Sequence, residues 1–81
     1  MYSPLPREAQ ILKRRREELH ITQAELSLEV GIQLRQYQRF EYGSRSFSNC
    51  NLRTALKICA ALQLDPFEVV FEDDQDLANS K

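Results

Sequence analysis

The sequence predicts an all-α protein, folded as a compact bundle of about five short helices. Only two glycines and three prolines occur among the 81 residues, which leaves few positions for the tight turns that join β-strands. Apolar residues instead recur at helical spacing in several segments. A chain of this length forms one small domain with one core. We place this domain in residues 1–71 and expect the acidic residues 72–81 to form a disordered tail.

The first helix is predicted over residues 7–20, which are strong helix formers. Leu12 and Leu19 lie seven positions apart and therefore share one face. His20 is expected at the C-terminal end of this helix. The basic run KRRR, residues 13–16, points all round the helix, so only one or two of its side chains can face any one partner.

The second and third helices are predicted from their end signals. Thr22 and Glu25 are spaced as a capping box, which starts a helix of about eight residues. Gly31 ends that helix, because glycine accepts the left-handed conformation common after helix C-termini. A third helix begins near Gln33 and stops at Gly43. Its inward side chains are expected to be Gln36 or Tyr37, together with Phe40.

The fourth and fifth helices follow a loop, residues 44–50, that reads as polar and irregular. Asn49 or Asn51 can cap the fourth helix, over residues 52–63. Its predicted inward face is Leu52, Ala55, Leu56, Cys59 and Leu62. Asp65 and Pro66 are typical of a helix start, which predicts a short fifth helix to about Phe71, although residues 69–71 could instead form a strand.

Composition excludes several classes of function. The two cysteines, nine positions apart, and the one histidine do not supply a zinc site, and no other metal or cofactor motif occurs. The sequence contains neither a serine–histidine–aspartate set nor a phosphate-binding glycine loop, so we do not expect an enzyme. The longest apolar run has five residues, so we expect no membrane span and a cytoplasmic protein.

Residues 1–60 carry ten Lys/Arg against six Asp/Glu, whereas residues 61–81 carry one Lys/Arg against six Asp/Glu. The body is thus basic, as in many nucleic-acid-binding proteins.

Residues 22–41 have the pattern of a helix-turn-helix unit, in which two short helices meet at a tight turn containing glycine. Such a corner needs a small residue where the helices approach, and Ser27 is small. It also needs apolar residues on the inner side, and the segment supplies Leu26, Val30, Ile32, Tyr37 and Phe40.

The region from about residue 12 to residue 70 resembles the lambda-repressor/Cro-type helix-turn-helix domains of the xenobiotic-response-element family of bacterial and phage regulators. The segments RREELHITQAELSLEVGI, RQYQRFEYGSR and LRTALKICAALQLDPFEV carry the resemblance. It implies a lambda-repressor-like fold in which the third helix is a recognition helix in the major groove of double-stranded DNA. It further implies a homodimer bound to a palindromic operator. We expect a transcription regulator, which represses where its site overlaps a promoter and activates where it contacts the polymerase from beside the promoter; repression is the expected role.

The resemblance implies roles for individual residues. Base contacts are expected from Gln33, Leu34, Arg35 and Arg39. Phosphate contacts are expected from Gln23, Gln36, Ser44 and Arg45. A structural ion pair is expected between Glu41 and Arg16, with Arg15 as the second choice. The dimer contact is expected at Phe67, Val70 and Phe71.

The chain departs from the family pattern at Gln33, where a capping serine or threonine is usual, and at Tyr37, where isoleucine or valine is common. His20 replaces a usual glycine, and the loop after Gly43 is about three residues longer than usual. An alternative function is an antitoxin or a controller-type regulator, which would bind a partner protein as well as DNA.

Overall fold

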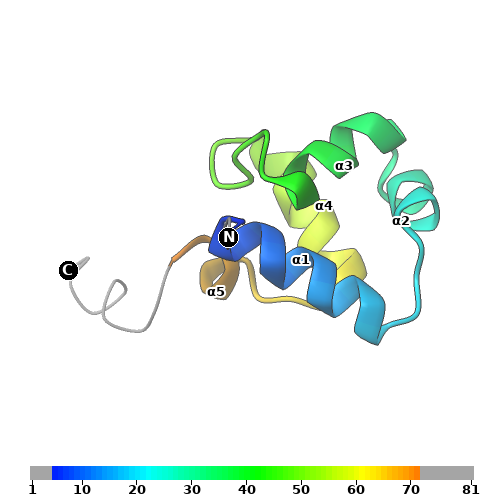
Figure 1. The fold of residues 1–81 in the computed structure, drawn as a ribbon, viewed down its shortest axis with the longest axis horizontal. Helices are drawn as coiled ribbons and strands as arrows, with labels where there is room; N and C mark the ends of the chain where they lie inside the picture. Colours follow the sequence, from blue (N-terminus) through cyan, green and yellow to red (C-terminus); the bar gives the residue numbers. More distant parts are fainter. Residues whose placement is uncertain (1–4, 72–81) are drawn as a thin grey trace, which may run out of the picture.

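The computed structural model describes residues 5–71 of the chain. They form five helices: α1 (Arg7–Glu18), α2 (Gln23–Val30), α3 (Leu34–Tyr42), α4 (Leu52–Leu62) and α5 (Pro66–Val70) (Figure 1). No strand occurs in this part of the chain, so the predicted all-α fold class is confirmed and the alternative strand near residue 70 is wrong. The tail expected at residues 72–81 lies outside the described residues.

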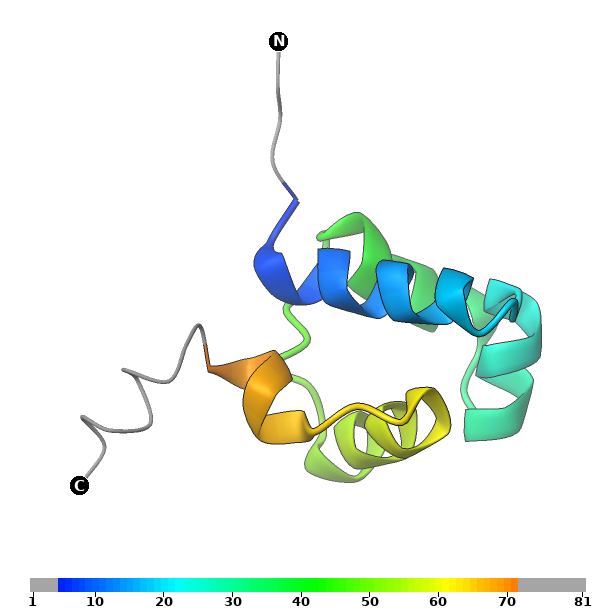
Figure 2. The ribbon, with the colours of Figure 1, turned by 90° about the horizontal axis from the view of Figure 1, so that it is seen from below.

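The long helices α1 and α4 lie on opposite sides of the core. In Figure 2, α3 lies beside α1, α2 lies across one end of the domain, and α5 lies at the other end. α2 contacts both α3 and α4, while α5 contacts both α1 and α4. The space between them is filled by buried apolar side chains, chiefly Leu12, Leu26, Tyr37, Phe40, Ile58 and Leu62. Burial of each such side chain contributes roughly 1.5–3 kcal/mol, which stabilises helices that would be marginal alone.

Left-handed residues follow the first four helices, and the one after α4 is Gln63, with φ of 57°. Gly31 and Gly43 follow α2 and α3 with φ angles of 86° and 79°, as the sequence predicts. His20 adopts the same conformation after α1, with φ of 58°, and lies just beyond the helix rather than at its last turn. For a residue that has a Cβ atom, the left-handed conformation costs about 1–2 kcal/mol. The turn is held by Arg16, whose NH1 donates to the carbonyl of Ile21 at 2.7 Å.

The starts of α4 and α5 are capped by side-chain oxygens. Of the two candidates for α4, Asn51 is the cap: its Oδ1 accepts from the backbone N–H groups of Arg53 and Thr54, at 2.8 and 3.4 Å. Asp65 Oδ1 accepts from the N–H of Phe67 at 2.9 Å, and Pro66 occupies the first helical position. Both caps satisfy backbone donors that have no partner within the helix.

The buried face of α4 differs from the predicted one. Leu52 and Leu56 were expected inside, yet they are 72% and 45% exposed, and Ile58 is buried instead. The residues of α4 that face the core are Ala55, Ile58, Cys59 and Leu62. The prediction failed because α4 carries two apolar stripes at helical spacing, and only its packing against the other helices decides which one is inside.

The loop between α3 and α4 is anchored, although it reads as polar. Phe47 is 1% exposed and packs edge-on against Phe40, with ring centroids 5.7 Å apart and planes at 89°. The hydroxyls of Ser46 and Ser48 donate to the carboxylate of Glu8 on α1. The loop is therefore tied to the domain by one buried aromatic ring and two polar contacts.

Arginines of α1 hold the C-terminal ends of other helices. Arg7 donates to the carbonyls of Glu68, Val69 and Phe71 at the end of α5, at 2.8, 3.2 and 2.8 Å. Arg15 Nε donates to the carbonyl of Leu62 at the end of α4, at 2.9 Å. The last carbonyls of a helix lack partners and carry partial negative charge. The two guanidinium groups donate hydrogen bonds to these carbonyls and carry the opposite charge. They therefore fix α4 and α5 against α1.

Candidate nucleic-acid interface

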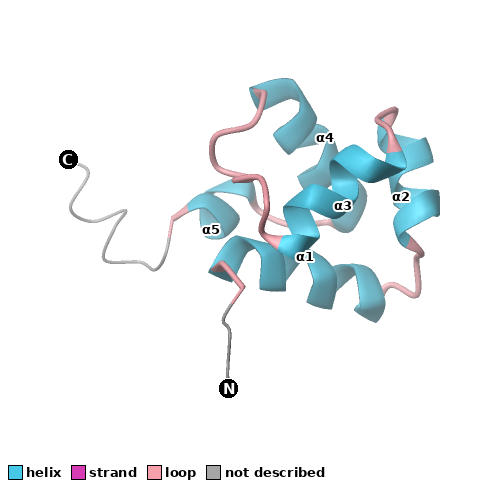
Figure 3. Cartoon of the chain, turned by 45° about the horizontal axis from the view of Figure 1, so that its top comes forward, coloured by secondary structure: helices cyan, strands magenta, loops and turns pink. Residues whose placement is uncertain are grey.

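Helices α2 and α3 are joined by a short turn (Figure 3). At the start of α2, both hydrogen bonds of the capping box form: the N–H of Glu25 donates to Thr22 Oγ1 at 3.0 Å, and the N–H of Thr22 donates to Glu25 Oε1 at 2.9 Å. At its end, the N–H groups of Gly31 and Ile32 both donate to the carbonyl of Ser27. These bonds close α2 at both ends and set the direction in which α3 leaves the turn.

Helix α3 turns Tyr37 and Phe40 inward, whereas its arginines point outward. Tyr37 and Phe40 are 0% and 1% exposed. The four residues predicted to contact bases are all exposed at one end and one face of this helix: Gln33, Leu34, Arg35 and Arg39. Gln36, which the sequence left as a possible inward residue, is half-buried, and so is Gln38.

The start of α3 agrees with the prediction of a helix that begins near Gln33. Gln33 is the N-cap residue, and its side chain makes no capping hydrogen bond. The first helical residue is Leu34. Glutamine does not reach back to the helix N–H groups as serine or threonine would, so the Gln33 side chain stays available to a ligand.

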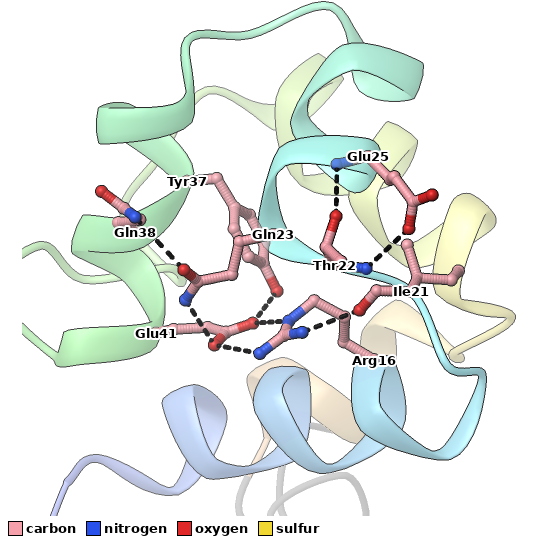
Figure 4. A network of polar contacts seen from close by, with 8 residues as sticks. All are labelled: Arg16, Ile21, Thr22, Gln23, Glu25, Tyr37, Gln38 and Glu41. Carbon is pink, nitrogen blue, oxygen red and sulfur yellow. Dashed lines mark hydrogen bonds and ion pairs between the residues drawn. The ribbon is translucent and has the colours of Figure 1, made fainter.

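Beneath the outward face, the buried carboxylate of Glu41 joins three helices (Figure 4). Arg16 of α1 donates to it through Nε at 2.6 Å and NH2 at 3.1 Å, a bidentate pair. The hydroxyl of Tyr37 donates to Oε2 at 2.5 Å, and Nε2 of Gln23 donates to Oε1 at 3.0 Å. Both carboxylate oxygens therefore accept two hydrogen bonds each. The structure brings together the pair that the sequence predicts, and adds two partners that it did not suggest.

The environment of Glu41 keeps it ionised. Burial opposes the charged form, but the hydrogen bonds from Arg16, Tyr37 and Gln23 outweigh it, so the pKa of Glu41 lies below its usual value. Burial, and then the hydrogen bond to Glu41, raises the pKa of Tyr37 far above its usual value, so its hydroxyl remains a donor. A carboxylate bonded in this way fixes α1, α2 and α3 relative to one another.

Gln23, predicted to contact phosphate, takes part in this network. Its Nε2 donates to Glu41, and its Oε1 accepts from Nε2 of Gln38 at 3.2 Å. One amide hydrogen of Gln23 is left for another partner. Sequence reasoning missed Gln38 and the Tyr37 hydroxyl. The only signal for Tyr37 was its position four residues before Glu41, which places the two side chains together on a helix.

The remaining predicted phosphate contacts lie around α3. Ser44 and Arg45 are exposed just beyond its C-terminus, where their N–H groups donate to the carbonyl of Arg39. The hydroxyl of Ser44 also lies 3.4 Å from that carbonyl. Of the basic run on α1, Arg15 and Arg16 are engaged within the domain, whereas Lys13 and Arg14 are exposed.

The predicted dimer contact forms an apolar surface. Phe67 is 61% and Val70 38% exposed. The ring of Phe71 stacks on that of Phe67, with centroids 6.3 Å apart. Leu52 and Leu56 of α4, which were predicted to be buried, line a shallow hollow together with these three residues.

Residues 5–71 contain no group of three or more histidine, cysteine or acidic side chains that could hold a metal ion. None of the five described helices is long and apolar enough to cross a membrane. The thiol of Cys59 is buried, which raises its pKa to about 11, so it behaves as an unreactive core residue.

A family model described as Helix-turn-helix, of the Cro/C1 type, matches residues 12–69. This range covers most of the chain, and the chain belongs to that family, which confirms the resemblance drawn from the sequence. No curated protein and no solved structure matches it. The family is one of DNA-binding domains found in transcription regulators and is typically non-enzymatic.

Proposed function

We propose that this protein is a small dimeric repressor that binds a palindromic DNA operator in the cytoplasm, with α3 as its recognition helix. The observation that supports it best is the outward face of α3, which combines exposed Gln33, Leu34, Arg35 and Arg39 and has no acidic residue before the buried Glu41. An α-helix fits the major groove of B-DNA, where each base pair presents a distinct pattern of donors and acceptors.

The chemistry of these side chains matches base edges. An arginine at position 35 or 39 can donate two hydrogen bonds to O6 and N7 of guanine. Gln33 can bond N6 and N7 of adenine, and Leu34 can only contact an apolar group such as the methyl of thymine. The proposed readout is therefore mixed, with arginines for G·C pairs beside glutamine and leucine for A·T pairs.

Phosphate contacts would position α3 in the groove. The N-terminus of α2 carries free backbone N–H groups and the positive end of a helix dipole, which favour a phosphate. Gln23, on the same helix, has one remaining amide hydrogen that could donate to a phosphate. Gln36 would contribute from the first turn of α3, and Ser44 and Arg45 from just beyond its C-terminus.

Loss of Arg35 should relax readout at a single operator position. In a selection from random DNA duplexes, we expect the wild type to enrich a palindromic motif and Arg35→Ala to lose the preference at one position of each half-site. The cost should be about 1–3 kcal/mol, the value of one good base contact. The test compares the enriched motifs of the two proteins and their affinities for single-base variants of the operator.

Arg14→Ala is the matched control, because Arg14 is an exposed arginine on α1 rather than on α3. It should weaken binding to all sequences alike, or not at all. Weak, salt-sensitive binding of the wild type with no enriched motif would contradict sequence-specific readout. The alternative of a protein-binding antitoxin or controller would then be the better description.

Dimerisation is proposed through the apolar surface of α4 and α5, formed by Leu52, Leu56, Phe67, Val70 and Phe71. Exposed apolar side chains gathered on one surface favour association. A two-fold dimer would place its recognition helices about 34 Å apart, one turn of the DNA helix.

Phe67→Ser should weaken this dimer strongly. Phe67 would leave water on both sides of the two-fold axis, so its loss should raise the dissociation constant of the dimer at least tenfold, by about 1.5–3 kcal/mol for each copy. Sedimentation at micromolar concentrations measures this. Leu28→Ser is the control, because Leu28 is also apolar and 83% exposed but lies on α2. A monomeric wild type at these concentrations would count against the proposed interface.

A further inference from the structure

The hydrogen bonds around Glu41 continue outward to a residue on the edge of the recognition face. Gln23 Nε2 donates to Glu41 Oε1 at 3.0 Å, and Gln38 Nε2 donates to Gln23 Oε1 at 3.2 Å. The direction of these bonds is set by charge. An ionised carboxylate can only accept, so the NH2 group of Gln23 must face Glu41. Its oxygen then faces Gln38, which must in turn present its own NH2 group to Gln23.

This chain of bonds leaves the carbonyl oxygen of Gln38 directed away from the network (Figure 4). Within the described residues, Gln38 Oε1 accepts no hydrogen bond, and one hydrogen on Nε2 is also unused. Gln38 follows Leu34 by one helical turn and Arg35 by three residues, so it shares the outward surface with both. A half-buried glutamine with a fixed amide therefore has one acceptor and one donor that are not used within the network.

We propose that Gln38 is a specificity-determining residue that reads adenine in the major groove, and that Glu41 and Gln23 act as positioning residues for it. The inference rests on the proposed function, since it requires α3 to lie in the groove. Adenine presents N6–H as a donor and N7 as an acceptor. Gln38 Oε1 would accept from N6–H, and its unused Nε2 hydrogen would donate to N7.

The fixed orientation of the amide explains why adenine is favoured. Guanine presents two acceptors, O6 and N7, so Gln38 Oε1 would face an oxygen instead of a donor. Cytosine N4–H could satisfy the oxygen but would leave the amide donor without a partner. A glutamine free to rotate by 180° about its last bond could reverse its donor and acceptor. Gln23 removes that freedom, because reversal would place two amide oxygens against each other.

The test compares three glutamine-to-methionine variants with wild type in the same selection from random duplexes. Methionine has nearly the length and volume of glutamine and lacks its amide. The wild type should prefer adenine at one symmetric position of each half-site, by about tenfold or more over the other bases. Gln38→Met should abolish that preference and leave the other positions, including the one lost with Arg35→Ala, unchanged.

The other two variants separate positioning from structure. Gln23→Met should reduce the adenine preference at the same position although Gln38 is intact. This loss of preference should be larger than any loss of affinity that is shared by all DNA sequences. Gln10→Met is the control, because Gln10 is an exposed glutamine on α1 that lies outside the network and outside the proposed DNA contacts. It should leave the adenine preference as in the wild type. Thermal unfolding of each variant confirms that the domain is folded.

Three outcomes would overturn the proposal. A motif that Gln38→Met leaves unchanged, or weakens equally at every position, would show that Gln38 reads no base, while the proposed DNA-binding function would stand. A Gln23→Met variant with the full adenine preference would remove the positioning role. Absence of any motif for the wild type would overturn this inference together with the proposed function.

Discussion

Replacement of Glu41 by alanine should lower the free energy of unfolding by about 3–5 kcal/mol, the cost of breaking a buried ion pair by removing one partner. Glu41 is 1% exposed, and its carboxylate accepts four hydrogen bonds from three side chains. Alanine would leave Arg16 with its charge unpaired in a largely buried position. Tyr37 and Gln23 would also lose their partners. For a domain of this size the melting temperature should fall by at least about 12 °C.

Glu29→Ala is the control for this substitution, because Glu29 is exposed on α2. Denaturant unfolding followed by circular dichroism should give a change within about 0.5 kcal/mol for the control. A loss below 1 kcal/mol for Glu41→Ala would show that the network does not hold the three helices together.

The same carboxylate predicts a pH dependence. Because folding lowers the pKa of Glu41, its stabilisation is fully present above the unfolded pKa of about 4.3 and is lost as pH falls through the lower folded value. The difference in stability between wild type and Glu41→Gln should therefore stay constant from pH 7 to about 5. It should shrink below about pH 4. A difference that grows on acidification would contradict the assigned direction.

Replacement of Phe47 by alanine should destabilise the domain by about 3–5 kcal/mol, as is typical for a buried aromatic residue. The ring is 1% exposed and packs edge-on against Phe40 of α3. Its removal leaves a cavity under the recognition helix and frees the loop that carries Ser44 and Arg45. Phe47→Leu should cost less, because it fills part of the cavity.

Asn49→Ala is the matched control, since Asn49 is an exposed residue of the same loop. Thermal and denaturant unfolding should separate the two variants clearly. A loss of less than 1 kcal/mol for Phe47→Ala would mean that the loop residue does not belong to the core.

Much of the fold could be predicted because its signals are local. Thr22 and Glu25 identify the start of α2 by their spacing alone, and Gly31 and Gly43 identify two helix ends by their backbone freedom. Asp65 and Pro66 likewise mark the start of α5. Each signal needs only a few neighbouring residues. The exposed residues of α3 could be predicted for the same reason, since the helical period separates them from Tyr37 and Phe40.

The errors concern residues whose environment is set by distant parts of the chain. Leu52 and Leu56 lie on an apolar stripe at helical spacing like the buried one, and the packing of α4 against α1, α2 and α5 leaves them exposed. Phe47 lies in a polar loop, and its burial depends on the position of Phe40. In both cases the local sequence permits two answers, and packing selects one.

The sequence by itself determined that this chain forms five short helices, that two of them make a helix-turn-helix, and that the third carries glutamine and arginine outward. Only the tertiary structure decided how Arg16, Gln23 and Tyr37 gather on Glu41, and how Gln38 is oriented through them. The physical reason is the range of the interactions. Helix ends and helical faces depend on backbone hydrogen bonds between near neighbours. A buried carboxylate instead needs donors from three helices, and their meeting depends on how those helices pack.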